Sequence, residues 1–174
     1  MRIFAACLSL MILAGCAGAE GGSTNSTTAQ SRASLEDWPA VAATIGGQSR
    51  LVDDVFIVAV PRTDLKDLLT VEGFDVPLAA GIESRFWFHR CSCGKMVVYG
   101  QFTVLDYEAN DVIDELRKGR MHVAGMSPMF LNERPRLTLI RFQGEDPSPE
   151  ILAKTIKAAL DWTGEARMPA QPMK

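Results

Sequence analysis

Two strand-like runs separated by only four residues set the strongest limit on what this chain can fold into. The runs are SRFWFHR at residues 84–90 and KMVVYGQFTVL at residues 95–105, and the residues between them are CSCG. Both runs are rich in the aromatic and β-branched residues that favour strands. Gly94 can supply the positive φ that a tight turn requires. The pattern therefore predicts a β-hairpin.

The rest of the chain predicts more strands than helices. Strands are expected in DVFIVAVPR, a β-branched run that ends near Pro61, and in MHVAGM and PRLTLIRF. Helical spacing of apolar residues predicts helices at residues 35–45, 107–118 and 148–162, the second ending at Gly119 and the third starting at Ser148. We expect an α+β fold, with helices packed on one face of a mixed or antiparallel sheet. A permuted ferredoxin-like unit is one arrangement that fits.

The first sixteen residues have the pattern of a bacterial lipoprotein signal. Met1 and Arg2 precede an apolar run, and Leu13-Ala14-Gly15-Cys16 follows it. That quartet resembles the lipobox, whose cysteine thiol takes a diacylglyceryl group. The run is too short to span a membrane, which needs about 20 apolar residues. We expect a signal peptide at residues 1–15 and acyl chains such as palmitate on Cys16; a plain secretory signal with an incidental cysteine is the alternative.

The sequence after Cys16 predicts a tether, a domain and a tail. Residues 16–34 have no large apolar side chain, so they cannot bury enough surface to offset the entropy of ordering. Residues 35–163 are long enough for a single globular domain, and residues 164–174 are expected to be loose. Two or three acyl chains would hold the protein on a membrane. The expected location is the extracytoplasmic side of a bacterial envelope, on the periplasmic face or the outer membrane.

Charge and motifs exclude several classes of function. The formal net charge is -3, and no polybasic stretch suited to nucleic acid is present, so we expect no nucleic-acid partner. The chain also lacks a nucleotide-binding loop of the GxxxxGK[ST] kind and an HExxH zinc motif. The classes that remain are a binding module, a metal-handling protein and an enzyme without a familiar motif.

Three charged residues at predicted element ends are candidate ligand-binding groups. Arg62 and Asp64 lie just past a strand end, and Glu108 lies near the start of the central helix. Together they can hold a small polar ligand at the end of the sheet. The structural alternative is a turn-stabilising Arg–Asp pair and a carboxylate favoured by the helix dipole.

The CSCG turn allows three interpretations. In an extended segment His89, Cys91 and Cys93 share one face, and with Met126 or Met129 they would suit Cu or Zn. A Cys91–Cys93 disulfide is the second interpretation, although cysteines two apart in a strand lie roughly 6.6 Å apart at their Cα atoms, near the limit for a bridge. The third is a pair of inert, partly buried thiols.

Three segments in the right order resemble the LppY/LpqO lipoprotein family, a bacterial domain of unknown function. They are VAVPRTDL at 58–65, VVYGQFTVLDYEANDV at 97–112 and NERPRLTLIRFQGEDP at 132–147. The resemblance implies a Gly-Asp pair where this chain has Gly100-Gln101, a Leu-His-Asn-His run within residues 124–129, and a histidine at Arg141. This chain lacks all three, and histidine is the usual metal ligand and proton shuttle.

These observations favour a non-enzymatic binding or interaction module without a cofactor, anchored to a membrane and recognising a small ligand or a protein. A lipoprotein that handles soft metal through His89, Cys91 and Cys93 is the first alternative. An enzyme of unknown reaction, built on Arg62, Asp64 and Glu108, is the second.

Overall fold

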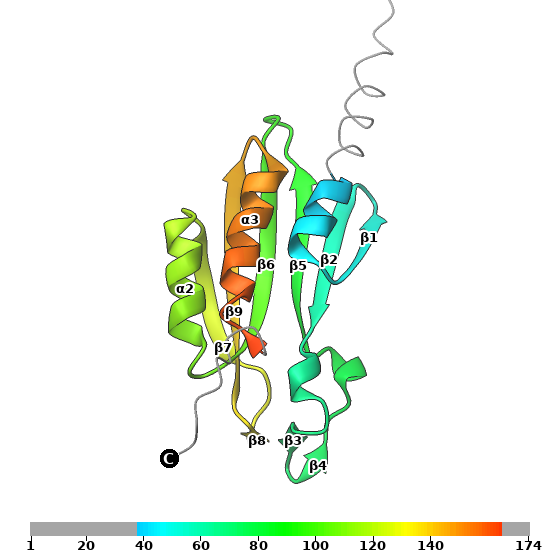
Figure 1. Cartoon of the computed structure of the whole chain (residues 1–174), viewed down its shortest axis with the longest axis vertical. Helices are drawn as coiled ribbons and strands as arrows, with labels where there is room; N and C mark the ends of the chain where they lie inside the picture. The colour runs from blue at the N-terminus through cyan, green and yellow to red at the C-terminus, as the bar shows by residue number, and fades with distance from the viewer. Residues whose placement is uncertain (1–37, 165–174) are drawn as a thin grey trace, which may run out of the picture.

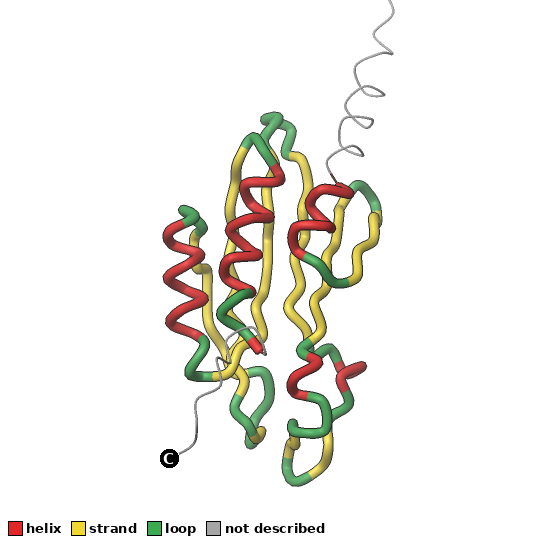
Figure 2. Tube along the Cα trace, viewed as in Figure 1, coloured by secondary structure: helices red, strands yellow, loops and turns green. Residues whose placement is uncertain are grey.

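The structure is a computed structural model that describes residues 38–164. The predicted signal peptide, the lipidation site Cys16, the tether and all but the first residue of the predicted tail lie outside the described residues. None of the helices described in this range is long and apolar enough to cross a membrane. Figure 2 shows the helices in red beside the long strands in yellow, with a smaller region of short elements below them.

The main sheet has six strands, and every neighbouring pair is antiparallel. The order across the sheet is β1-β2-β5-β6-β9-β7. Its strands are β1 (Gln48–Val52), β2 (Val55–Pro61), β5 (Glu83–Arg90), β6 (Met96–Leu105), β7 (His122–Pro128) and β9 (Leu137–Asp146). The predicted hairpin is β5–β6, and Gly94 in its turn has φ of 84°. The antiparallel form of the predicted α+β fold is therefore confirmed.

The connections confirm the permuted ferredoxin-like unit. Helix α2 (Ala109–Lys118) joins β6 to β7, and these two strands leave a gap that β9 fills. Helix α3 (Pro149–Leu160) follows β9, so the chain order β5-β6-α2-β7-β9-α3 gives the spatial order β5-β6-β9-β7. This is a βαββαβ unit whose last strand has moved to the front of the chain. Strands β1 and β2 extend the sheet beyond β5.

The helices within residues 38–164 all cover the same face of the sheet. Figure 1 shows α2, α3 and the first helix, residues 38–45, side by side in front of the strands. Strand side chains alternate between the two faces, and in β5 Phe86 and Phe88 are fully buried against the helices. Trp38 of the first helix stacks on Phe56, with ring centroids 4.8 Å apart. The core therefore lies between one layer of helices and one face of the sheet.

A smaller sheet closes one end of the molecule, and the sequence did not predict it. It has the order β4-β3-β8, from β3 (Thr70–Val71), β4 (Phe74–Asp75) and β8 (Glu133–Arg134). Two 3₁₀ turns, η1 (Thr63–Leu65) and η2 (Leu78–Ala80), lie beside it. A second apolar cluster sits there, formed by Leu65, Leu69, Ile82, Leu105 and Leu137. Strands of two residues are too short to show the alternation of apolar and polar residues that predicts a strand.

Strand β1 was also missed, because all five of its residues are exposed and show no apolar alternation. Asp53 and Asp54, the two residues that join it to β2, both have positive φ, 48° and 63°. A turn of this kind usually contains Asn-Gly or Asp-Gly. Asp-Asp is a weaker turn signal, and Asp54 is the first residue of the predicted strand DVFIVAVPR.

Gly119 ends α2 as predicted, but for a different reason. Its φ is -78°, and the left-handed residue is Arg120, with φ of 59°. The amide of Met121 donates to the Leu116 carbonyl over 2.8 Å, as in a Schellman motif. A Cβ on Gly119 would come within 2.1 Å of the Thr155 side chain. Gly119 is therefore needed for the close approach of α2 to α3.

Candidate functional site

One face of the six-stranded sheet is not covered by the described helices, and we call it the open face (Figure 1). It is defined by the residues that alternate with the buried ones, of which the central members are Ile57, Ala59, Arg85, Trp87, His89, Tyr99, Gln101, Arg141 and Gln143. Such a mixture of aromatic and polar residues on a broad sheet face offers both stacking and hydrogen bonding. It is therefore a candidate surface for ligand binding.

Two arginines frame the middle of the open face. Arg85 on β5 is opposite Gln101 on β6, and Gln101 is opposite Arg141 on β9. At about 4.8 Å between strands, the Cα atoms of the two arginines lie roughly 10 Å apart. Arg141 Nη1 donates to Ser127 Oγ over 3.0 Å, and Arg85 forms an ion pair with Glu83. Two guanidinium groups therefore share one row of the sheet.

An aromatic cluster lies in the next rows. Trp87 and Tyr99 are cross-strand partners, and the guanidinium carbon of Arg85 is 6.0 Å from the centre of the Trp87 ring. His89 stacks on Tyr99, with ring centroids 5.8 Å apart and planes 7° apart. Tyr99 remains 49% exposed. The cluster therefore combines flat rings with an adjacent cation.

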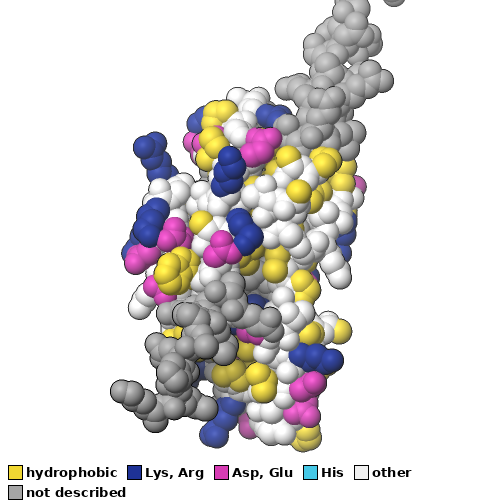
Figure 3. Space-filling view, in the orientation of Figure 1, with side chains coloured by type: hydrophobic (Ala, Val, Ile, Leu, Met, Phe, Trp, Pro, Cys, Tyr) yellow, Lys and Arg dark blue, Asp and Glu magenta, His cyan; other side chains and the backbone are white. Residues whose placement is uncertain are grey.

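The open face carries more positive than negative charge, although the whole chain is acidic. Its carboxylates Glu83 and Glu145 are paired with Arg85 and Lys95. Arg50 and Arg85 line a hollow of about 170 Å³ between β1, β2 and β5, and Arg141 lies further along the sheet. On the helix side, by contrast, side chains of both signs are interspersed (Figure 3). The open face is thus the more basic side.

Residues from three strands meet on the open face around Arg141. Gln101 and Arg141 are opposite each other, Arg141 is opposite Gly125, and Ser127 is within hydrogen-bond distance of Arg141. No local pattern in the sequence groups these positions. The missing information was strand order, because the residues come from three strands. The available signal was the alternation of polar and aromatic residues in β5.

The three predicted ligand-binding residues do come together, in a buried ion cluster. Arg62 Nε and Nη2 donate to the two carboxylate oxygens of Asp64 over 2.9 and 2.8 Å. Nη1 and Nη2 also donate to the two carboxylate oxygens of Glu108, over 2.9 and 3.1 Å, and Nη1 donates to the Thr103 carbonyl over 2.6 Å. A guanidinium has five N–H donors. All five are used within the protein.

The same cluster connects segments that are far apart in the chain. Glu108 is fully buried and accepts hydrogen bonds from the amides of Leu105 and Gly164 over 2.8 Å each. Burial alone would lower the pKa of Arg62. The hydrogen bond to Asp64 and the charges of Glu108 and Asp64 outweigh burial, so the pKa of Arg62 is raised above its ordinary value. The arrangement holds Arg62 charged and leaves it no free donor for a ligand.

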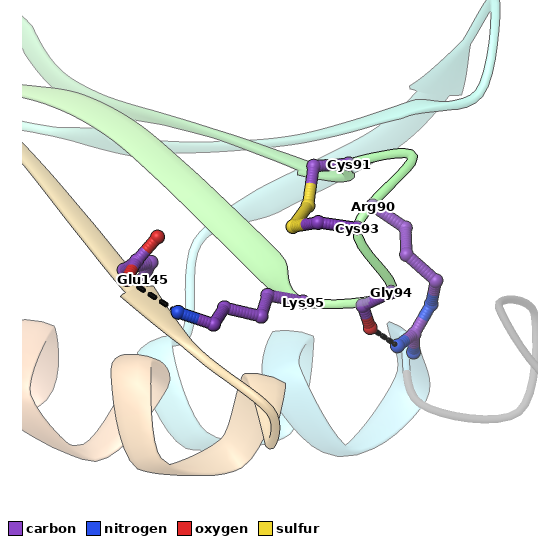
Figure 4. Close-up of a disulfide and its surroundings, with 6 residues drawn as sticks. All are labelled: Arg90, Cys91, Cys93, Gly94, Lys95 and Glu145. Atoms are coloured by element: carbon purple, nitrogen blue, oxygen red, sulfur yellow. Dashed lines mark hydrogen bonds and ion pairs between the residues drawn. A yellow bond between two sulfur atoms is a disulfide. The ribbon is translucent and has the colours of Figure 1, made fainter.

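The CSCG turn contains a disulfide between Cys91 and Cys93 (Figure 4). Their Cα atoms are 5.2 Å apart, shorter than the extended spacing expected from sequence, because the segment turns instead of continuing the strand. The turn has its own hydrogen bonds: the Cys91 amide donates to the Lys95 carbonyl over 2.9 Å, and the Gly94 amide donates to the Cys91 carbonyl over 3.0 Å. A bridge that closes so short a loop raises the free energy of unfolding by only about 1.6 kcal/mol, because it removes little entropy from the unfolded chain.

The predicted soft-metal set is not assembled in this structure. Both sulfurs are in the disulfide, and His89 stacks on Tyr99. Met126 is opposite Ile140 on β9, whereas the hairpin tip is level with Asp146, six residues away and roughly 20 Å along the strand. Met129 packs on the second apolar cluster. Within residues 38–164, no group of three or more His, Cys, Asp or Glu side chains could hold a metal ion.

A larger cavity of about 520 Å³ lies beside the loop that joins β7 to β9. Its polar lining includes Asp106, Glu133 and Arg136. Glu133 accepts hydrogen bonds from the amides of Phe130 and Leu137, each over 3.0 Å, and Asp106 accepts one from Thr138 over 3.2 Å. The two carboxylates therefore form hydrogen bonds that stabilise the loop. Arg136 is exposed and forms no hydrogen bond or ion pair with a described residue.

Fold and surface together define an α+β protein with an antiparallel sheet, one face of which no helix within residues 38–164 covers. The chain belongs to the family described as Domain of Unknown Function (DUF1259), whose model matches residues 39–162. No curated protein and no solved structure matches the chain. The family assignment covers nearly the whole described region and leaves the activity open.

Proposed function

We propose that this protein is a lipid-anchored, extracytoplasmic member of the LppY/LpqO type, and that its open face is a non-enzymatic surface that binds an acidic polysaccharide. The observation that carries the proposal is the row Arg85, Gln101, Arg141 beside the aromatic pair Trp87 and Tyr99. The sequence pattern that ends at Cys16 supports the anchor.

Each part of the open face suits one part of such a ligand. Guanidinium groups bind carboxylates through two parallel hydrogen bonds. The negative face of an aromatic ring attracts the weakly positive C–H groups on the flat side of a sugar ring. The two arginines, roughly 10 Å apart, can reach acidic groups on separate units of one chain.

The shape of the open face favours an extended ligand. Its hollow is about 170 Å³, below the roughly 300–1,000 Å³ of ordinary small-molecule pockets. A polymer can instead lie across several strands and gather weak contacts along its length. The Arg62 cluster does not offer such a site, because its donors are already used.

Binding should depend on the acidic groups of the polymer. We expect the purified mature protein to bind polygalacturonate, and to bind its fully methyl-esterified form at least about tenfold more weakly, since a hydrogen bond to a charged group contributes about 1.5–3 kcal/mol. Arg141→Gln should weaken binding by a similar factor. Because Arg141 is exposed, its substitution should leave the unfolding midpoint unchanged. Isothermal titration calorimetry measures both effects.

Arg117→Gln is the matched control, because it removes an exposed arginine from α2 on the covered side of the sheet. It should bind polygalacturonate as the wild type does. Equal affinity for the charged and esterified polymers, or wild-type affinity in Arg141→Gln, would rule out the proposed role of the open face.

The anchor is tested separately. In bacterial cells the wild-type protein should incorporate labelled palmitate and remain in the membrane fraction until detergent is added. Cys16→Ser should lose the label and be released without detergent, or remain as an unprocessed precursor without label. Label retained in Cys16→Ser, or a wild-type protein recovered entirely without detergent, would contradict the anchor and leave the open-face proposal untouched.

A further inference from the structure

The Cys91–Cys93 disulfide contributes little to the fold, which raises the question of what it does. It lies at the tip of the β5–β6 hairpin, where Cys91 is half-buried and residues 92–95 are exposed. The hairpin is held by six cross-strand pairs from Arg85 to Arg90, and the turn has two backbone hydrogen bonds of its own. None of these interactions involves sulfur.

The size of the closed loop supports the same conclusion. A bridge between residues two apart lowers the entropy of the unfolded chain only slightly. It shifts the folding equilibrium by about fifteen-fold, far less than a bridge that closes a long loop. Because the turn is closed by the backbone hydrogen bonds between Cys91 and Lys95 and between Gly94 and Cys91, the reduced pair can keep the same hairpin. A centre that cycles between two redox states needs this property.

The accessibility of the bridge also suits exchange. Cys93 is exposed and Cys91 is half-buried, so Cys93 is the residue that an incoming thiolate can approach more easily. Arg90 and Lys95 border the turn in Figure 4; Arg90 Nη1 donates to the Gly94 carbonyl over 3.0 Å, and Lys95 pairs with Glu145 over 2.7 Å. Both cations are therefore held by oxygen acceptors at the hairpin tip.

We propose that Cys91–Cys93 is a thiol–disulfide exchange centre that oxidises a dithiol of a partner protein. This activity is independent of the proposed polysaccharide binding. A thiolate of the partner attacks Cys93 Sγ, the Cys91–Cys93 bond breaks, and Cys91 leaves as a thiolate that takes up a proton. The second partner thiolate then attacks the partner sulfur of the mixed disulfide and releases Cys93, which is protonated in turn. Two electrons pass to the protein, the partner ends as a disulfide, and a small-molecule disulfide such as oxidised glutathione can restore the bridge.

The test measures oxidation of a synthetic dithiol peptide by oxidised glutathione, with and without catalytic amounts of the full protein. We expect at least a tenfold increase in rate, lost in Cys91→Ser, in Cys93→Ser and in the double variant. A monothiol peptide should form a mixed disulfide with the wild-type protein at Cys93, detected by mass spectrometry after acid quenching.

Stability measurements keep the result interpretable. The double variant should fold, with an unfolding equilibrium within about fifteen-fold of the wild type, so its lost activity would reflect the sulfurs. A wild-type protein that gives no rate increase overturns the proposal. The proposal is also overturned if the double variant fails to fold and glutathione cannot reduce the disulfide of the folded wild-type protein. The disulfide would then serve only to stabilise the structure.

Discussion

Arg62→Met is expected to lower the free energy of unfolding by about 3–5 kcal/mol, the usual cost of removing one partner from a buried ion pair. The substitution keeps much of the side-chain volume but leaves the fully buried Glu108 beside Asp64 with no cation. It also leaves the Thr103 carbonyl without its donor. Chemical denaturation of the purified protein, followed by tryptophan fluorescence, gives the free energy directly.

Two further variants separate charge from geometry. Arg62→Lys keeps the charge but has three donors in place of five, so it should lose less stability than Arg62→Met. Asp64→Asn should cost least, because the Asp64 side chain is 17% exposed and the Glu108 contacts remain. The account is contradicted if the free energy of unfolding of Arg62→Met lies within about 1 kcal/mol of the wild-type value, because a difference of that size is the ordinary effect of a single substitution. If that variant also lost ligand binding, the cluster would be a binding site.

Gly100→Ala should destabilise the protein by about 1–3 kcal/mol, the usual cost of overpacking a core. A Cβ at this position would lie 2.4 Å from two ring atoms of Phe142 and 2.9 Å from one of Phe86. In a strand, replacing glycine by alanine ordinarily raises the free energy of unfolding by roughly 0.5–1 kcal/mol. The clash is expected to exceed that gain, because the three rings of Phe86, Phe102 and Phe142 are packed against one another.

Gly125→Ala is the matched control for this prediction. Gly125 is in the same sheet, has no positive φ, and a Cβ there would meet nothing within 4 Å. That variant should be as stable as the wild type or slightly more stable. Adding Phe142→Leu to the Gly100→Ala variant should recover part of the lost stability, because the smaller side chain makes room for the new Cβ. A Gly100→Ala protein that melts at the wild-type temperature would show that the aromatic core is packed differently.

The sequence predicts the fold well where apolar periodicity is strong. The β5–β6 hairpin, both long helices and the packing of helices on one face follow from alternating or helical spacing, as in Phe86 and Phe88. Strand β1 and the small sheet were missed because their strands are exposed or only two residues long.

The candidate sites were harder to predict because they depend on contacts between distant segments. The meeting of Arg62, Asp64 and Glu108 was anticipated, but their saturation depends on backbone groups of Thr103, Leu105 and Gly164. The open face depends on strand order, which no local pattern specifies. The cysteines were recognised from sequence, and the turn geometry then placed them in a disulfide.

The proposed ligand surface can be located directly by nuclear magnetic resonance. Backbone amide signals of the isotope-labelled mature protein would be followed as polygalacturonate is added. The account predicts that the perturbed signals belong to β5, β6 and β9 around Arg85, Tyr99 and Arg141, with no change near Arg62. Perturbations confined to the loop around Arg136, or no perturbation at concentrations well above those of the calorimetric titration, would contradict the central claim that the open face is the binding surface.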